Sequence, residues 1–376
     1  MTGTVTRPRA GAGGASLQAD ALRAERLGHW ERAAELFARA FRAGVLRGAA
    51  EQAVDALRGQ ARIRLQQARH DEAEELAELS RQIARAHGLG RAVARATNVI
   101  ALVRYAVQDF ASAQALHEAA LDLAVDEGDD ELIGMACLNL GVVSSLRGDL
   151  RGARVRFLES IGSSVRSGDK RGELMAYNNL GALAGLLQEW LEAQVYLDRG
   201  IEIAERIGDS AQLARLSLNR AEALLQLGDH GRARDALAVA QQQVAAVSDG
   251  LAEVDVLRLW GMLAREQGDA EDARARFRRA LELSEAAGLP YKRAETLREW
   301  ALLHRVNGDE PRAQGTLAEA RAIFAGLGST HEVARVDVLA ARGGTPQKLP
   351  GGTGWPAANA HLRPGGGLAA ARSVSA

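Results

Sequence analysis

Residues 130–170 hold one complete unit of a repeat, and they read DELIGMACLNLGVVSSLRGDLRGARVRFLESIGSSVRSGDK. Over Leu132–Leu146, apolar residues recur about every three to four positions, which predicts a helix. Gly148 and Asp149 interrupt this spacing, which then resumes and lasts until Gly168. The stretch therefore predicts two helices joined by a tight turn.

Small residues return at the same place in every unit, 40 positions apart. Alanine fills the strictest of these columns, at Ala33, Ala73, Ala113, Ala153, Ala193, Ala233, Ala273 and Ala313. Three further columns of Ala, Gly or Ser run in register with it. Repeats of about 20–50 residues are typical of stacked architectures. Here the small side chains would let neighbouring helices approach closely.

The residues at the breaks between helices have a physical role. Glycine adopts the left-handed backbone conformation that ends many helices. An acidic residue follows the break in the middle of most units, where we expect its carboxylate to cap the next helix. These residues are Asp109, Asp149, Glu189, Asp229, Asp269 and Asp309.

Composition excludes several classes of protein. The chain has 47 Lys and Arg against 48 Asp and Glu, a net charge of -1, which excludes a broadly basic nucleic-acid-binding surface. The single cysteine, Cys137, excludes an intrachain disulfide framework and a Cys-rich metal site. No stretch approaches the about 18 apolar residues of a membrane span, and residues 1–16 lack the apolar core of a signal peptide. We expect a cytoplasmic protein without a direct nucleic-acid or membrane partner.

The repeats predict an all-α fold. We expect an α-solenoid of about eight antiparallel helix pairs, followed by a C-terminal capping helix that reaches Ala341. The solenoid with its cap would span residues 14–342. Residues 1–13 and the Gly- and Pro-rich tail 343–376 are expected to be disordered.

Two motifs in these columns resemble the tetratricopeptide repeat (TPR) family, whose pattern contains L-G and A-x3-F. The L-G part is matched at Leu140-Gly141 and Leu180-Gly181, and the A-x3-F part at Ala33 with Phe37, Ala153 with Phe157 and Ala273 with Phe277. The period here is 40 residues, against about 34 in the family pattern, and the terminal proline is absent.

The longer repeats look like the sensor arrays of bacterial signal-responsive regulators and peptide-pheromone receptors, and like kinesin-light-chain-type cargo arrays. The family resemblance implies a right-handed superhelix. In such a superhelix the first helix of each pair lines a concave groove, and the groove binds a peptide or a partner protein.

No catalytic, cofactor-binding or metal-binding pattern emerges from the sequence. The run His331-Glu332-Val333-Ala334-Arg335 begins like the zinc-protease motif, but an arginine stands where the second histidine ligand is required. The glycine-rich residues 11–16 lack the lysine of a phosphate-binding loop. We therefore expect neither an enzyme nor a cofactor.

Asparagines form the strongest functional pattern. Asn139, Asn179 and Asn219 occupy the same position in three consecutive units, and the resemblance places that position on the groove. An amide carries both a donor and an acceptor, so it can bond the C=O and N–H groups of a peptide backbone. Asn98 and Asn178 lie one residue earlier in their units and would extend the row. The alternative interpretation is that these amides satisfy neighbouring groups of the chain itself.

Arginines are the second candidate set. Arg215, Arg258 and Arg298 lie at other groove positions of the C-terminal units, where their guanidiniums would suit the carboxylates of an acidic ligand. The alternative is a mixed face whose charges pair with one another. The acidic residues on the same helices are Glu222, Asp255, Glu266, Glu295 and Glu299.

These patterns favour a non-enzymatic scaffold or adaptor that holds an extended peptide or partner segment. The alternative is a ligand-sensing regulator that acts on a separate transcription or signalling partner, because residues 1–13 and 343–376 are too short to add a DNA-binding domain to this chain. Exposed terminal units could also stack head to tail into a homo-oligomer.

Overall fold

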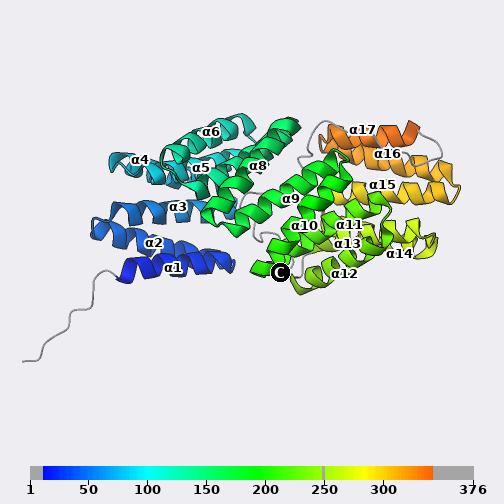
Figure 1. The fold of residues 1–376 in the computed structure, drawn as a ribbon, viewed down its shortest axis with the longest axis horizontal. Helices are drawn as coiled ribbons and strands as arrows, with labels where there is room; N and C mark the ends of the chain where they lie inside the picture. The colour runs from blue at the N-terminus through cyan, green and yellow to red at the C-terminus, as the bar shows by residue number, and fades with distance from the viewer. Residues whose placement is uncertain (1–11, 248–249, 342–376) are drawn as a thin grey trace, which may run out of the picture. The chain divides into compact units, whose positions relative to one another are not determined.

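The computed structural model describes residues 12–247 and 250–341. These residues form helices and turns and contain no strand. Figure 1 shows the helices in chain order. The first eight are α1 (Ala12–Arg26), α2 (Trp30–Leu46), α3 (Ala50–Gln66), α4 (His70–Ala86), α5 (Gly90–Ala106), α6 (Phe110–Asp126), α7 (Asp130–Leu146) and α8 (Leu150–Ser167).

The remaining helices continue the same alternation to the end of the described chain. They are α9 (Lys170–Leu186), α10 (Trp190–Ile207), α11 (Ser210–Leu227), α12 (His230–Val247), α13 (Gly250–Glu266), α14 (Ala270–Ala286), α15 (Pro290–Val306), α16 (Glu310–Gly326) and α17 (Thr330–Ala341). We expected disorder in residues 1–13 and 343–376. Residues 12 and 13 belong to α1, and the other residues of these two segments lie outside the described part of the chain.

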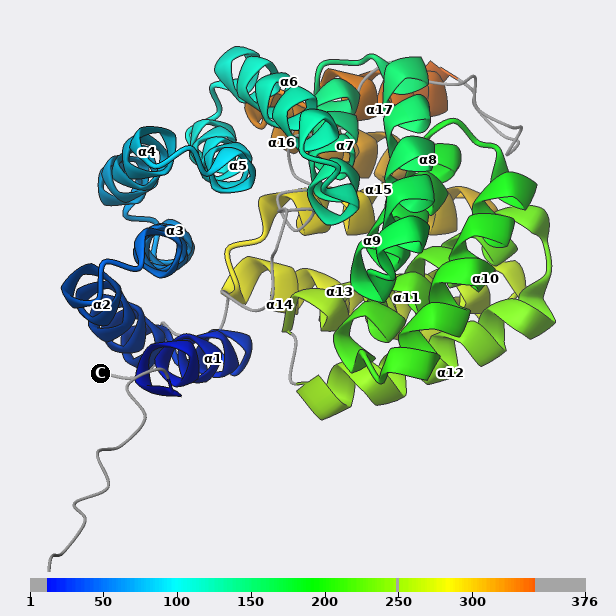
Figure 2. The same ribbon diagram turned by 60° about the vertical axis from the view of Figure 1, so that its left-hand side comes forward.

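The chain divides into two compact units at a boundary within α7, between Val143 and Ser144. In each unit, successive helices pack against one another as antiparallel pairs, and Figure 2 shows this for α1 to α6 of the first unit. In the second unit, α17 packs on α16 and buries Glu332 and Val336. The all-α solenoid predicted from the repeats is confirmed.

The small columns lie where helices approach most closely. All eight residues of the alanine column are at most 1% exposed. A Cβ atom added to Gly181 would stand 2.6 Å from the Leu197 side chain, and one added to Gly261 would stand 2.6 Å from the Phe277 ring. These contacts leave no room for a larger side chain, which is why the columns hold Ala, Gly and Ser.

Five of the six acidic residues after the mid-unit breaks cap the next helix as expected. Gly168 ends α8 at φ 75°, and Asp149 accepts a hydrogen bond from the Gly152 N–H at 2.9 Å. Glu189 makes no such cap; its carboxylate pairs with Arg154 instead. Its extra methylene carries the carboxylate past the start of α10 and within reach of α8, so the predicted cap is wrong at this turn.

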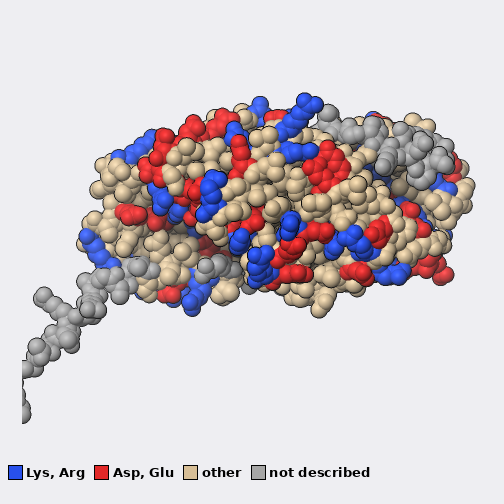
Figure 3. Space-filling model, in the orientation of Figure 1, with Lys and Arg blue, Asp and Glu red and all other residues tan. Residues whose placement is uncertain are grey.

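Charges of both signs are mixed on the surface. In Figure 3, Lys and Arg lie among Asp and Glu over the face shown. Within the described residues, no helix is long and apolar enough to cross a bilayer.

Candidate functional site

The candidate residues all lie on the first helices of their pairs. Asn98 lies on α5 and Asn139 on α7, within the first unit. The second unit carries the rest: Asn178 and Asn179 on α9, Arg215 and Asn219 on α11, Arg258 on α13 and Arg298 on α15.

In the first unit, Asn98 and Asn139 form a buried amide pair. The Asn139 Nδ2 group donates to Asn98 Oδ1 at 3.3 Å, and the two residues are 2% and 1% exposed. The Asn98 Nδ2 group points to the sulfur of Met135, 3.3 Å away. Met135 itself is 40% exposed, so one flexible side chain lies between the pair and solvent.

His117 joins this pair from α6, and the sequence patterns did not single it out. Its Nδ1 atom lies 2.9 Å from Asn98 Oδ1, and its side chain is fully buried. Burial lowers the pKa of the His117 imidazole to about 3, so the ring is neutral at pH 7. The missed signal was its position four residues after Ala113, where the A-x3-F pattern calls for an apolar residue.

In the second unit, Asn178 and Asn219 form an amide pair with the same spacing. The Asn219 Nδ2 group donates to Asn178 Oδ1 at 3.2 Å. Both pairs join residues 41 positions apart, and in both the later residue donates to the earlier one. Asn179 is also buried, on α9 beside Asn178. In both pairs, an asparagine of the 40-residue column therefore bonds to one that stands one position earlier in its own unit.

Arg258 is paired within the chain. Its guanidinium lies 3.4 Å from Glu222 and 3.3 Å from Asp255, and its side chain is only 3% exposed. Burial opposes the charge, but the neighbouring carboxylates outweigh it and raise the pKa of Arg258 further. An acidic ligand would have to displace one of these carboxylates.

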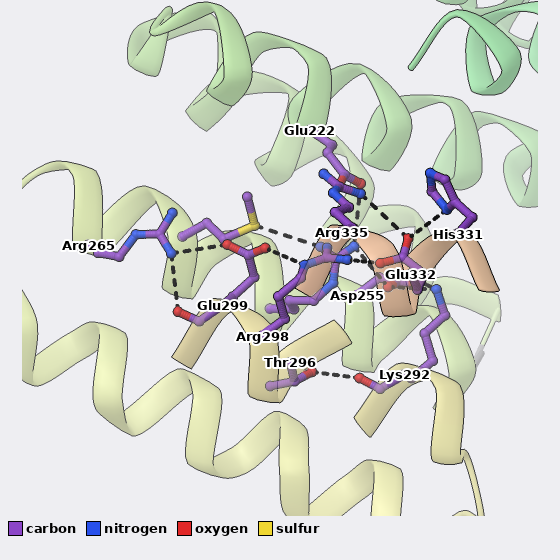
Figure 4. A network of polar contacts seen from close by, with 12 residues as sticks. Glu222, Asp255, Arg265, Lys292, Thr296, Arg298, Glu299, His331, Glu332 and Arg335 are labelled. Carbon is purple, nitrogen blue, oxygen red and sulfur yellow. Dashed lines mark hydrogen bonds and ion pairs between the residues drawn. The ribbon is translucent and has the colours of Figure 1, made fainter. Parts of the chain in front are cut away.

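Arg298 is equally enclosed, and Figure 4 shows its surroundings. Its Nε atom lies 3.2 Å from Glu299, and it also pairs with Glu332 of the capping helix. On the far side of Glu299, Arg265 pairs with the same carboxylate at 3.0 Å. Burial would raise the pKa of Glu299, but the surrounding guanidiniums lower it to about 2.

Lys292 extends this ion network to α13. Its ammonium lies 2.9 Å from Asp255 and 3.0 Å from Glu295. Burial alone would raise the pKa of Glu295, but Lys292 and the nearby arginines lower it to about 2. These contacts favour the mixed, self-paired interpretation. The sequence patterns missed Lys292 and Glu332, although they lie 37 and 34 positions after their partners Asp255 and Arg298.

The remaining candidate, Arg215, is half-buried on α11, one turn before Asn219. No group of three or more His, Cys, Asp or Glu side chains within the described residues could hold a metal ion. In the zinc-like run, Glu332 contacts Arg335 at 3.5 Å, so its carboxylate belongs to the ion network.

Residues 172–243 match the family model of the tetratricopeptide repeat. This part of the chain therefore belongs to the tetratricopeptide repeat family. The matched segment runs from α9 to α12 and contains Asn178, Asn179, Arg215 and Asn219. No curated protein sequence matches the chain.

Solved structures with a similar fold include bacterial regulators. A Rap protein complexed with competence and sporulation factor is 10% identical, covering 87% of this chain and 96% of its own, with a TM-score of 0.56. The Rap conjugation gene regulator of plasmid pLS20, in complex with the Phr* peptide, is 13% identical, covering 74% and 76%, with a TM-score of 0.54. The quorum sensor NprR from B. thuringiensis is 11% identical, covering 87% and 97%, with a TM-score of 0.51. At these identities the likeness concerns the fold.

Proposed function

We propose that this protein is a non-enzymatic scaffold that holds an extended peptide or partner segment on the first helices of a unit. The observation that carries the proposal is the pair of amide contacts, Asn98 with Asn139 and Asn178 with Asn219. Both have the same 41-residue spacing and the same donor direction. Two similar solved structures contain a bound peptide or factor, which supports this class of ligand.

The amides suit a peptide backbone because each pair uses only part of its hydrogen-bonding capacity. An asparagine side chain has two N–H donors and an oxygen with two lone pairs. In the first pair, Asn139 Oδ1 is buried without a hydrogen-bond partner among the described residues, and Asn98 Nδ2 has only a thioether sulfur. A peptide C=O and N–H would complete both groups.

The ion network of the second unit is not assigned a role in peptide binding. Arg258, Arg298 and Glu299 are buried and paired with the chain itself, so they are already satisfied without a ligand. Peptide contacts are therefore assigned to the amides, where the buried Asn139 Oδ1 atom has no hydrogen-bond partner among the described residues.

The second candidate is a sensor that acts on a separate transcription or signalling partner. The fold of the Rap regulators and of NprR favours it. Small-angle scattering separates the two candidates. A sensor should change its radius of gyration when the peptide binds, whereas a scaffold should keep it.

The direct test is selection from a library of random seven-residue peptides displayed on phage, followed by affinity measurement on the full chain. Asn139→Ala, in the first unit, and Asn219→Ala, in the second, are tested separately. At least one of them should weaken binding of a selected peptide about two- to tenfold, since one lost hydrogen bond is worth about 0.5–1.5 kcal/mol. Asn307→Ala, at an exposed position after α15, is the matched control and should leave affinity unchanged. Equal affinities of the parent and all three variants would refute the proposal.

A further inference from the structure

His117 stands in a repeat column that is otherwise apolar. The other members of this column are Phe37, Ala77, Phe157, Leu197, Leu237, Phe277 and Leu317. Like most of them, His117 is fully buried between helices. Burying an imidazole where Leu or Phe packs equally well adds desolvation without adding apolar contact, so its polar atoms need another explanation.

Those atoms determine which way Asn98 faces. The oxygen of the Asn98 amide lies 2.9 Å from His117 Nδ1 and 3.3 Å from Asn139 Nδ2. An amide oxygen can only accept, so His117 must carry its proton on Nδ1. Its Nε2 atom then bears the lone pair, and this atom has no hydrogen-bond partner in the described part of the chain.

The three side chains could satisfy one another in a second way. If both amides turned over, Asn98 Nδ2 would donate inward to Asn139 Oδ1 and to His117 Nδ1, which would then have to be unprotonated. Asn98 Oδ1 would in that case face the Met135 sulfur, which has no proton to give. In the observed arrangement Asn98 Nδ2 donates to that sulfur at 3.3 Å. The tautomer of His117 and the direction of both amides are therefore coupled.

We propose that His117, as the Nδ1–H tautomer, is a positioning residue that fixes the polarity of the Asn98–Asn139 pair. Asn98, whose oxygen accepts from both neighbours, then offers a donor to a bound backbone, and Asn139 offers its unpartnered oxygen as an acceptor. The peptide segment seated here is one that places a C=O at Asn98 and an N–H at Asn139. This inference rests on the proposed function, because it assigns the contacts of the same peptide-binding face.

The Met135 sulfur occupies the position at Asn98 Nδ2 that a peptide carbonyl would take. A thioether sulfur is a weak acceptor, and the Met135 side chain is flexible and partly exposed. A peptide carbonyl that displaced it would give Asn98 Nδ2 a stronger acceptor.

The second unit contains a natural control. Asn178 and Asn219 form the same kind of pair, but the corresponding position on α10 is Leu197, which cannot donate to the Asn178 oxygen. The direction of that pair depends on the two amides alone.

The first test needs no ligand. In the full-length protein at pH 7, the ¹⁵N shifts of the His117 ring should show a protonated Nδ1 and an unprotonated Nε2. The Nε2–H tautomer, or an imidazolium, would overturn the proposal.

Variants then separate positioning from packing. His117→Leu supplies the residue found elsewhere in this column, and should give the Asn98 side-chain amide a second set of signals or faster hydrogen exchange. The Asn178 amide should not change. His117→Gln can still donate to Asn98 and should restore the single state. An Asn98 amide that is unchanged in His117→Leu would overturn the proposal; if that variant fails to fold, His117→Phe takes its place.

Affinity completes the test, with a phage-selected seven-residue peptide as the probe. His117→Leu should weaken binding about three- to tenfold, the effect of one hydrogen bond, and His117→Gln should stay within about twofold of the parent. Unchanged affinity in His117→Leu, despite a disordered Asn98 amide, would overturn the positioning role while leaving peptide binding intact. If no peptide is selected, the proposed function fails, whereas the tautomer measurement still tests the arrangement of the three side chains.

Discussion

Two neighbouring repeat positions carry amides on first helices from α5 to α11 and charges on α13 and α15. Asn98 and Asn178 correspond to Arg258 and Arg298, and Asn139 and Asn219 to Glu299. In the amide pairs, each contact leaves donors or acceptors over for a ligand. In the ion network, the charges satisfy one another. Under the proposed function, such a position is available to a partner where it carries an amide and is already satisfied where it carries a charge.

The largest expected effect comes from breaking the ion network. Arg298→Met leaves Glu299 and Glu332 buried without their shared partner. We expect the free energy of unfolding to fall by about 3–5 kcal/mol, the usual effect of removing one member of a buried pair. Urea denaturation measures this.

The matched control for that variant is an exposed pair. Arg321 lies 2.6 Å from Asp337, and both side chains are 49% exposed. Arg321→Met should therefore change stability by less than about 1 kcal/mol. Equal effects of the two substitutions would contradict the distinction between a buried network and a surface pair.

Acid should affect the two regions in different pH windows. The pKa of folded His117 is about 3 against a usual 6.5, so the unfolded chain binds the proton more readily. The stability of the amide cluster should then fall as the pH drops below about 6.5. For Glu299, with a folded pKa of about 2 against 4.5, the contribution is complete above about pH 4.5 and is lost toward pH 2.

Hydrogen exchange, converted to protection free energies between pH 7 and pH 3, checks these windows separately for α6 and α15. His117→Leu should remove the change of α6 that begins near pH 6.5 and leave α15 as it was. If α6 and α15 lost protection over the same pH range, or if His117→Leu kept the loss in α6 that begins near pH 6.5, these separate pH ranges would be wrong.

Close contact between helices should limit the size of the side chains in the small columns, independently of the amides and charges. Gly261→Ala places a methyl group 2.6 Å from the Phe277 ring, and we expect a loss of about 1–3 kcal/mol by overpacking. Gly315→Ala is the control, because a Cβ there meets nothing within 4 Å on α16. It should stabilise by about 0.8–1 kcal/mol through helix propensity. Thermal denaturation of both variants gives the comparison.

The smallest expected effect is at a turn. Gln108 holds a φ of 64°, where most other mid-unit turns carry glycine. Gln108→Gly should stabilise the protein by about 1 kcal/mol, because the left-handed conformation strains a side chain. Gly148→Ala, at φ 84°, should have the opposite sign. Unfolding midpoints would show both changes.

How much the sequence could predict depended on periodicity. The alanine column and the turn glycines predicted the helix pairs, because close packing and left-handed turns accept few residue types. The asparagine column did not predict the contacts that its members make. It aligned residues 40 apart, whereas the two amide pairs join residues 41 apart.

His117 and Lys292 are residues whose contacts the sequence patterns did not predict. His117 was hidden because its role depends on Asn98, 19 positions away on another helix of the same pair. Lys292 was one of several charges on its helix, and only the spatial neighbourhood of Asp255 distinguishes it. Both roles arise from contacts between helices, which a pattern along one helix does not contain.

The proposed function requires that the paired asparagine amides form hydrogen bonds with a peptide backbone. The most direct measurement is an N-methyl scan of a phage-selected peptide, in which each backbone N–H is replaced in turn while the side chains stay the same. Methylation at one or two positions should weaken binding at least about fivefold, and this loss should disappear in Asn139→Ala. Affinity that follows only the peptide side chains, with no sensitivity to backbone methylation, would contradict the proposed function.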